Sequence, residues 1–148
     1  SALNIDISEP ACKMADENFA LNDLDDKAKS ISMDGFEAIK EYAGQSDRVI
    51  LDPPAFAKNI KARHKAVIGY KRLNEMTIRR IPPGGILFTF SCSQVVDRKL
   101  FYDTVTAAGI EAGRQLQIIH YLSQGADHPI NLFHPEGSYL KGLALRVL

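Results

Sequence analysis

Short apolar runs alternate with longer amphipathic stretches along the chain. The apolar runs are rich in Val, Ile, Leu and Phe, as in "RVILD" and "ILFTF", which is typical of buried strands. The stretches between them carry apolar residues at three- and four-residue spacing, which predicts helices. The predicted strands cover residues 3–6, 28–33, 48–52, 86–90, 115–122 and 139–148, and the predicted helices cover residues 8–21, 34–43, 62–81 and 97–108.

Residues that start or stop an element mark several of these boundaries. Ser8 is a predicted N-cap, with Pro10 in the first helical turn, where proline is tolerated. Pro53 and Pro54 end the third strand, because neither can donate a ladder hydrogen bond. "PPGG" at 82–85 ends the third helix. The predicted packing faces of the first and third helices are formed by Ala11, Ala15 and Phe19, and by Ala66, Tyr70, Leu73, Thr77 and Ile81.

Alternation of strands and helices predicts an α/β fold with a mostly parallel sheet and helices on both of its faces. The last two strands have no helix between them, so they are expected to pair antiparallel at one edge. The segment that joins them, residues 123–138, has no periodicity and is long for a loop in a compact domain. The 148 residues correspond to about one domain, and no linker divides them.

Composition narrows the function classes. Lysine plus arginine (18) equals aspartate plus glutamate (18), which argues against nucleic-acid binding by bulk charge but leaves a local basic strip open. No apolar run approaches the ~20 residues that span a bilayer, and the first ten residues do not resemble a signal peptide. Two cysteines and four scattered histidines predict neither a disulfide scaffold nor a metal site. A reduced, cytoplasmic location is expected.

Ligands of such sheets bind beyond the carboxyl ends of the strands, and two acids in the first part of the chain lie there. Asp6 ends the first predicted strand and could accept the hydroxyls of a ribose, although a turn residue would occupy the same position. Asp34 follows the second predicted strand and could receive the amine of an adenine, with Phe36 against the ring. Helix capping is the alternative interpretation of Asp34 and is favoured by position alone.

"LDPPAF" is a sharper signal at the end of the third predicted strand. Two prolines fix the backbone after Asp52, which makes a stiff segment whose carboxylate and carbonyls could meet the edge of a planar ring. Phe56 could stack on that ring. A plain turn does not require an aromatic residue after Asp-Pro-Pro, so a functional role is favoured.

Cys92 follows the fourth predicted strand, in "FTFSCS", and is expected in the same crevice as Asp52. A thiolate there is a soft nucleophile that can add to C6 of a pyrimidine. Ser91 and Ser93 would supply hydroxyls and keep the strand end uncrowded. Packing is an equally good explanation of Cys92 from spacing alone, because free cysteines are often buried. For Cys12, early in the first helix, packing is the favoured explanation.

The order of these motifs, with "ADHP" and "PEGSYLKG" after them, resembles class I S-adenosylmethionine-dependent methyltransferases. Within them the chain looks like the RlmI/YccW-like ribosomal RNA large-subunit cytosine-5 methyltransferases. The resemblance covers essentially the whole chain. It implies a Rossmann-like methyltransferase sheet, mostly parallel, with an antiparallel C-terminal edge hairpin.

The resemblance also implies roles for the candidate residues. Cys92 would add to C6 of a cytosine in ribosomal RNA, so that C5 becomes able to accept the methyl group. An aromatic C5 is a poor nucleophile until C6 is saturated, and the base would have to leave its stack. The implied sets are: catalytic, Cys92 and Asp52; cofactor-binding, Asp6, Asp34, Gly35, Phe36, Asp52 and Pro53; substrate-binding, Pro54, Phe56, Ser91 and Ser93.

The chain departs from the family at its start. The family's first strand, its glycine-rich cofactor turn and an N-terminal RNA-binding domain are not found, so the chain is expected to be a piece of a longer protein that is inactive alone. The absent strand would lie between those ending in Asp6 and Asp52, and the basic surface that grips RNA would lie outside the chain. His128 or Lys141, near the crevice, could contact the base or RNA, and packing explains them equally well.

Two other functions compete with RNA methylation. An amine-methylating enzyme of the same fold would also use an Asp-Pro-Pro-aromatic motif, but Ala55 displaces the ring and Cys92 would have no role. A non-catalytic α/β fragment is the other alternative. The sequence leaves a homodimer open.

Overall fold

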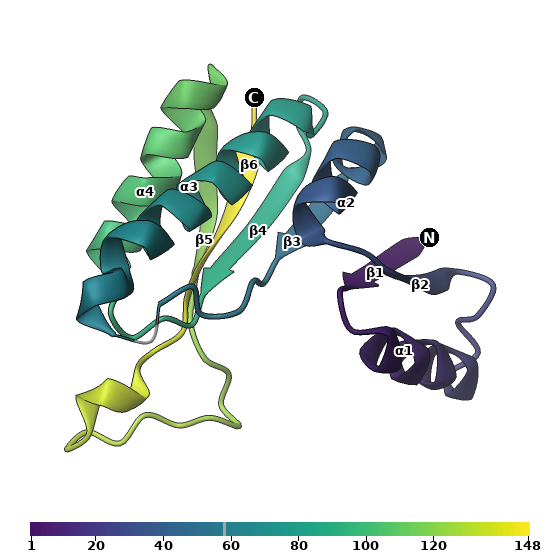
Figure 1. The fold of residues 1–148 in the computed structure, drawn as a ribbon, viewed down its shortest axis with the longest axis horizontal. Helices are drawn as coiled ribbons and strands as arrows, with labels where there is room; N and C mark the ends of the chain where they lie inside the picture. The colour runs from purple at the N-terminus through teal and green to yellow at the C-terminus, as the bar shows by residue number, and fades with distance from the viewer. Residues whose placement is uncertain (58) are drawn as a thin grey trace. The chain divides into compact units, whose positions relative to one another are not determined.

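Strands and helices alternate along the chain until the last two strands, as the hydrophobic pattern predicts (Figure 1). The computed structural model describes residues 1–57 and 59–148. The strands are β1 (Ala2–Asp6), β2 (Ala28–Ser32), β3 (Arg48–Leu51), β4 (Ile86–Ser91), β5 (Leu116–Leu122) and β6 (Lys141–Val147). The helices are α1 (Glu9–Leu21), α2 (Gly35–Tyr42), α3 (Arg63–Arg80) and α4 (Arg98–Ala112), with short 3-10 helices η1 (Ala43–Gln45), η2 (Ile60–Ala62) and η3 (Pro135–Gly137).

Local capping residues set several helix boundaries. The Ser8 side chain caps α1 by accepting a hydrogen bond from the Ala11 N–H at 3.4 Å. Asp97 caps α4 in the same way, at 2.8 Å from the Leu100 N–H. Gly113 ends α4 in the left-handed region (φ 69°), which a residue without a Cβ adopts freely. These boundaries therefore follow from short-range chemistry, and they lie within a few residues of the predicted ones.

The chain forms two compact units, residues Ser1–Tyr42 and Ala43–Leu148. The first contains a two-stranded sheet, β1-β2, and the second contains a four-stranded sheet in the order β3-β4-β6-β5. The predicted α/β class is thus confirmed. The strands ending in Asp6 and Asp52 were not expected to be direct neighbours, and among the described strands β1 and β3 do not pair with each other. Each of β1 and β3 pairs with one neighbour within the described residues, so no hydrogen-bonded ladder joins the two sheets.

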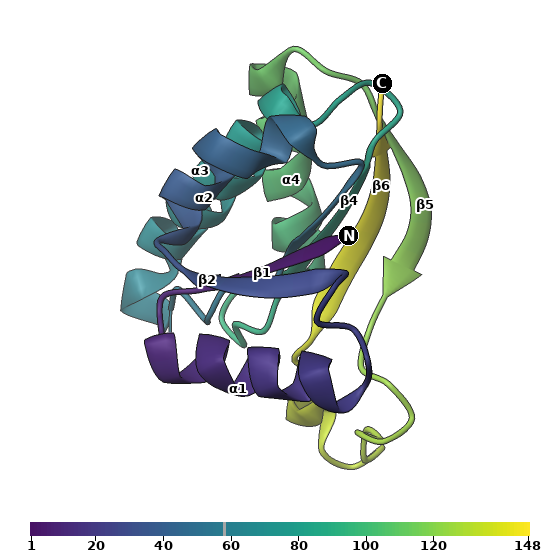
Figure 2. The ribbon, with the colours of Figure 1, turned by 90° about the vertical axis from the view of Figure 1, so that its right-hand side faces the viewer.

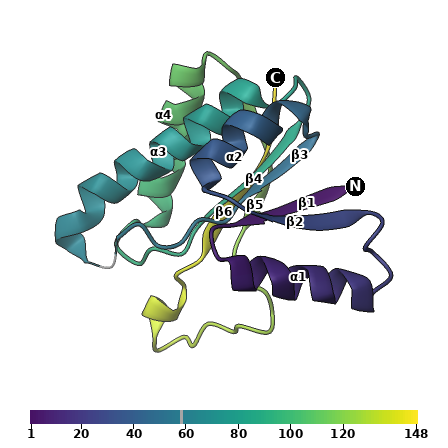
Figure 3. The ribbon, with the colours of Figure 1, turned by 45° about the vertical axis from the view of Figure 1, so that its right-hand side comes forward.

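The first unit packs α1 beside a parallel pair of strands (Figure 3). The register pairs Asp6 with Ser32, so both strands end at the same edge. The predicted packing face of α1 is shifted by one residue: Cys12 is buried and Ala15 and Phe19 are half-buried, whereas Ala11 is exposed. Residues 12, 15 and 19 lie on one face of a helix, as the predicted residues 11, 15 and 19 also would. The burial of Cys12 agrees with the predicted packing role.

The second unit combines a parallel pair, β3 and β4, with the antiparallel strand β6 and the edge strand β5 (Figure 1). The predicted antiparallel C-terminal hairpin is confirmed, and β6 also pairs with β4, where Ser91 lies opposite Lys141. Helices α3 and α4 lie together on one face of this sheet (Figure 2), where helices on both faces were predicted. The core between them and the sheet contains the fully buried side chains of Tyr70, Ile78, Leu87, Phe101 and Val105.

No helix in the described part of the chain combines the length and the hydropathy that crossing a membrane would require.

Candidate active site

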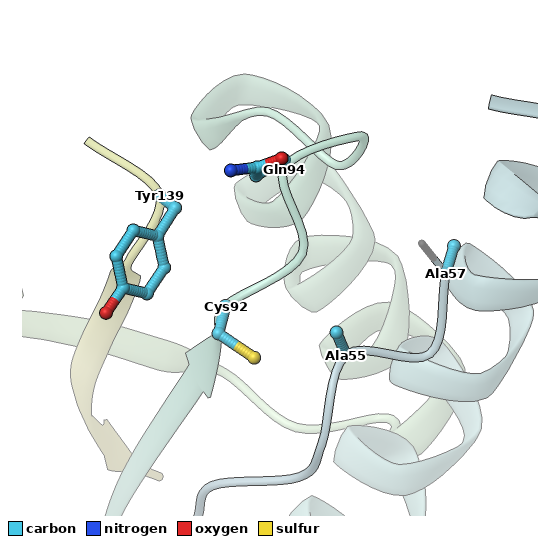
Figure 4. Close-up of a pocket in the computed structure, with 5 residues that line it drawn as sticks. All are labelled: Ala55, Ala57, Cys92, Gln94 and Tyr139. Atoms are coloured by element: carbon cyan, nitrogen blue, oxygen red, sulfur yellow. The ribbon is translucent and has the colours of Figure 1, made fainter. Parts of the chain in front are cut away.

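A cavity of about 300 Å³ lies beyond the carboxyl end of β4 (Figure 4). Cys92 is the first residue after the strand and is half-buried, and its sulfur points toward Ala55. The cavity is lined by Ala55, Ala57, Cys92, Gln94 and Tyr139. The thiol is therefore accessible from a hollow large enough for part of a small planar molecule.

The two serines beside Cys92 point into the protein. Ser91 and Ser93 are 0% and 1% exposed, respectively. The Ser93 hydroxyl donates a hydrogen bond to the Ala57 carbonyl at 2.9 Å, and the Ser91 hydroxyl accepts one from the Ser93 N–H at 3.4 Å. Both serines thus support the loop around Cys92 in this structure, and their predicted contact with a substrate stays a prediction. Alternation along an extended backbone explains the result, because residues on either side of Cys92 face the opposite way.

Asp52 lies at the same edge of the sheet as Cys92, since β3 and β4 are parallel neighbours with Leu51 opposite Thr89. This pairing confirms that the strand before Asp52 is adjacent to the strand before Cys92. Asp52 and Pro54 are exposed and Pro53 is half-buried. The segment then turns so that Ala55, not Asp52, lines the cavity with Cys92. The catalytic role of Asp52 and the ligand contacts of the prolines stay predictions.

Phe56 packs on the helix that covers the sheet. Its ring centroid lies 4.6 Å from that of Tyr70, and a Cβ added at Gly69 would lie 3.1 Å from its Cδ2. Glycine at 69 therefore makes room for this ring. The half-buried Phe56 holds the segment after Asp52 against α3, and its predicted stacking on a base stays a prediction.

Lys141 is buried beneath the loop that carries Cys92. The residue is 4% exposed, and its ammonium group donates to the carbonyls of Ser93, at 2.5 Å, and Tyr139, at 2.9 Å. Burial lowers the pKa of Lys141, and the charge of Cys92 acts in the opposite direction. The lysine thus ties together the two segments that flank the cavity, and in this structure it contacts protein carbonyls where contact with RNA was considered.

Gln94 and Tyr139 also line the cavity, and the sequence did not single them out as site residues. Tyr139 comes from the segment before β6, which reaches the cavity because β6 pairs with β4. Gln94 lies two residues after Cys92, so period-two alternation could have identified it. No comparable local signal exists for Tyr139, because its position depends on strand order.

The candidates of the first unit make local hydrogen bonds. Asp6 Oδ1 accepts from the Ser8 N–H at 2.7 Å, and Asp34 Oδ1 accepts from the N–H groups of Phe36 and Glu37 at 2.9 and 3.3 Å. Both acids are exposed beyond the carboxyl ends of paired strands. A Cβ at Gly35 would meet nothing within 4 Å, so the space beside it is open. This edge can accommodate the polar groups of a nucleoside, and the cofactor contacts stay predictions.

The long segment before β6 is exposed and carries both polar and apolar side chains, with Leu132 and Phe133 89% and 87% exposed. His128 lies 2.9 Å from Asp127, and this hydrogen bond lowers the pKa of Asp127. His134 lies 3.2 Å from Glu136. Within residues 1–57 and 59–148 no three His, Cys, Asp or Glu side chains are placed to hold a metal ion. The predicted contact of His128 with a base or RNA is not tested by this arrangement.

Known proteins resemble the chain in sequence over nearly all of its length. It is 43% identical over 151 aligned residues to ribosomal RNA large subunit methyltransferase I of Alteromonas mediterranea and 42% identical over 152 to that of Pseudoalteromonas atlantica. These alignments cover 99% and 100% of this chain but 38% of each relative. The chain thus spans about two fifths of the length of the curated relatives that it matches. No family model matches the chain.

Solved structures show the same fold at low sequence identity. SMU.776, solved in complex with SAH, has a TM-score of 0.75 at 20% identity and covers 97% of this chain and 38% of its own. NSun6 from Pyrococcus horikoshii, solved with SFG, has a TM-score of 0.64 at 18% identity, over 98% of this chain and 40% of its own. An O-methyltransferase from Bacillus cereus in complex with SAH has a TM-score of 0.58 at 9% identity, over 99% and 61%.

The chain is therefore similar, over nearly its whole length, to part of the ribosomal RNA large subunit methyltransferases I, and it shares a Rossmann-like fold with solved methyltransferases.

Proposed function

We propose that the chain carries the nucleophile of an enzyme that methylates C5 of a cytosine in ribosomal RNA. The observation that carries the proposal is the presentation of Cys92: its thiol opens into a cavity, while both adjacent serines are buried and bonded inside the protein. A cysteine that served packing alone would be buried, as Cys12 is. Methylation of an amine would give this accessible thiol no role.

The chemistry follows from the electron demand of the base. Cys92 Sγ, as the thiolate, forms a bond to C6, and the electrons of the C5–C6 double bond move to C5, which becomes nucleophilic. S-adenosylmethionine, when bound, supplies the electrophilic methyl group and leaves as S-adenosylhomocysteine. After transfer, loss of the C5 proton and breakage of the Cys92–C6 bond restore the double bond and release the thiolate.

Residues around Cys92 support this role by positioning it. Lys141 and Ser93 tie the loop to Tyr139 and Ala57, which limits movement of the thiol relative to the cavity. A fixed nucleophile requires less ordering at the moment of reaction. In the first unit, Asp6 and the segment from Asp34 to Phe36 are the proposed holders of the ribose and adenine of the cofactor.

The test uses the intact protein, S-adenosylmethionine and RNA that contains 5-fluorocytosine. Fluorine replaces the proton that must leave C5, so the covalent protein–RNA adduct should accumulate. Cys92→Ser should reduce adduct formation by at least about 1,000-fold, the loss expected when a covalent nucleophile is removed. Cys12→Ser is the matched control and should form as much adduct as the wild type. Equal adduct from Cys92→Ser would refute the assignment.

A further inference from the structure

The charge of this neutral chain is unevenly distributed. From residue 53 to residue 74 there are six lysines and arginines, a third of the 18 in the chain, together with His64, and no aspartate or glutamate. Four of these basic residues lie together on η2 and the first turn of α3, namely Lys61, Arg63, His64 and Lys65, and are called here the basic strip. All four are exposed.

Among the described residues, the lysines and the arginine of the basic strip have no carboxylate partner. Within the described part of the chain, Lys61, Arg63 and Lys65 form no ion pair within 4.0 Å, whereas Lys71 pairs with Glu111 at 2.8 Å and Lys99 with Asp103 at 2.5 Å. An unpaired surface cation keeps its full charge for an external anion. The clustered, unpaired cations of the strip can therefore bind phosphate.

The start of α3 increases the positive potential. Ala62 occupies the N-cap position and makes no side-chain capping bond, and the first turn contains no acid. Arg63 and Lys65 occupy that turn although each cation near a helix N-terminus costs about 0.3–1 kcal/mol. In contrast, Asp97 caps α4. Cations that oppose the helix dipole raise the positive potential at this end, which favours a bound anion.

The strip is close to the Cys92 cavity along the chain. Ala57 lines the cavity and is bonded by the Ser93 hydroxyl, and Lys61 follows four residues later. Four residues span at most about 14 Å even when fully extended. A strand whose base enters the cavity would therefore pass the strip within a few nucleotides.

A second cavity lies next to the basic strip. It has a volume of about 460 Å³, lies between the starts of α3 and α4 and is lined by Arg63, His64, Val67, Asp97, Lys99, Leu100 and Asp103. Its two acids already have partners, since Asp97 accepts from the Leu100 N–H and Asp103 pairs with Lys99. Arg63 is thus the cation of this cavity without a carboxylate partner.

We propose that the basic strip binds the phosphates of the single-stranded RNA that flanks the base in the Cys92 cavity. The inference rests on the proposed function, because it is the target base that places RNA next to the strip. It also revises the sequence-based expectation that the RNA-gripping surface lies wholly outside this chain. Single-stranded RNA is the fitting form because the target base must leave its stack.

The experiment measures binding of the intact protein to a cytosine-containing single-stranded RNA over a range of salt concentrations. The strip variant combines Lys61→Gln, Arg63→Gln and Lys65→Gln. Its control combines Lys13→Gln, Lys27→Gln and Lys29→Gln, which removes the same charge from exposed positions in the first unit. With ~0.7 released counterions per contact on a single strand, the salt slope should fall by about 2 and the affinity by about 10- to 100-fold near 0.15 M salt.

The outcomes separate the two proposals. The control should change the affinity less than 2-fold, and the thermal midpoint of the strip variant should not fall, because its changes remove cations that oppose the helix dipole. An unchanged salt slope in the strip variant, or an equal loss of affinity in the control variant, would refute the proposal that the basic strip binds RNA. At saturating RNA the strip variant should still form the 5-fluorocytosine adduct. If the wild type forms no adduct, the proposed chemistry is wrong. The salt slope still shows whether the basic strip binds RNA.

Discussion

In both units, candidate site residues lie at the carboxyl ends of strands. In the first unit their side chains make local hydrogen bonds, whereas in the second unit a thiol opens into a cavity. In the first unit, Asp6 and Asp34 accept hydrogen bonds from backbone N–H groups two or three residues away, and Cys12 is buried. In the second unit, Cys92 opens into a cavity that residues from three separate segments line. A carboxylate just after a strand can accept hydrogen bonds from the next few backbone N–H groups, so its position depends on local sequence. An accessible thiol between buried residues is held in place by contacts with segments far away in the sequence.

The largest difference between the units should be in thiol reactivity. Under native conditions, iodoacetamide should label Cys92 about 100-fold faster than Cys12, because a buried group reacts only after local opening that costs free energy. Cys12 is 6% exposed, and its thiol donates to the Asp6 carbonyl at 3.6 Å. Peptide mass spectrometry after timed labelling measures both rates. Comparable rates would show that the first unit opens easily and would remove the contrast.

Lys141 tests whether long-range contacts hold the second site. Lys141→Met should destabilise the protein by about 1–3 kcal/mol, because it leaves the buried Ser93 carbonyl and the partly buried Tyr139 carbonyl without this donor. Lys99→Met is the matched control: its ion pair with Asp103 is exposed, and loss of such a pair costs about 0–1 kcal/mol. Urea denaturation measures both variants. Equal stabilities would mean that the bonds of Lys141 to Ser93 and Tyr139 add nothing.

The acids of the two units should respond differently to removal of the carboxylate. Asp34→Ala should lower the stability by about 1 kcal/mol, the usual cost of losing a helix N-cap. Asp52→Ala should change the stability by less than about 0.5 kcal/mol, as for ordinary surface sites, because Asp52 is exposed and its carboxylate accepts no hydrogen bond from residues 1–57 and 59–148. Urea denaturation of the two variants gives the comparison. A larger loss for Asp52→Ala would reassign that residue to structure.

The smallest expected effect is a pH dependence that comes from Lys141. Because burial lowers the pKa of this lysine below 10.5, the unfolded chain binds more protons than the folded one between the folded pKa and 10.5. The stability of the wild type relative to Lys141→Met should therefore rise as the pH rises through that window and stay constant below it. Denaturation at a series of alkaline pH values measures the difference. A fall with rising pH would mean that the carbonyl contacts outweigh burial.

Local signals predicted much of the fold. Ser8 caps α1, the "PPGG" turn ends α3, and the predicted stripe of Ala66, Tyr70 and Leu73 is buried. Each of these features depends on residues within one or two helical turns, so a single sequence is sufficient to identify them. That β1 and β3 do not pair was expected only from the family resemblance, because strand order depends on contacts between segments far apart in the sequence.

The candidate site was predicted in part, for the same reason. Cys92 and Asp52 were placed at the ends of adjacent strands, and β3 and β4 are indeed neighbours. The buried serines and the packing of Phe56 on Tyr70 were not anticipated, because each depends on a contact with a distant segment. The lining of the cavity by Tyr139 depends on the pairing of β6 with β4.

By itself, the sequence determined the α/β order of elements, their caps and breaks, the basic run after Asp52 and the position of Cys92 just past a strand. These are properties of neighbours along the chain. The tertiary structure decided that Cys92 is the accessible member of "SCS" and that Lys141 is buried below it. Burial is the reason: whether a side chain meets solvent, a carbonyl or another ring depends on segments that strand pairing brings together from far apart in the sequence.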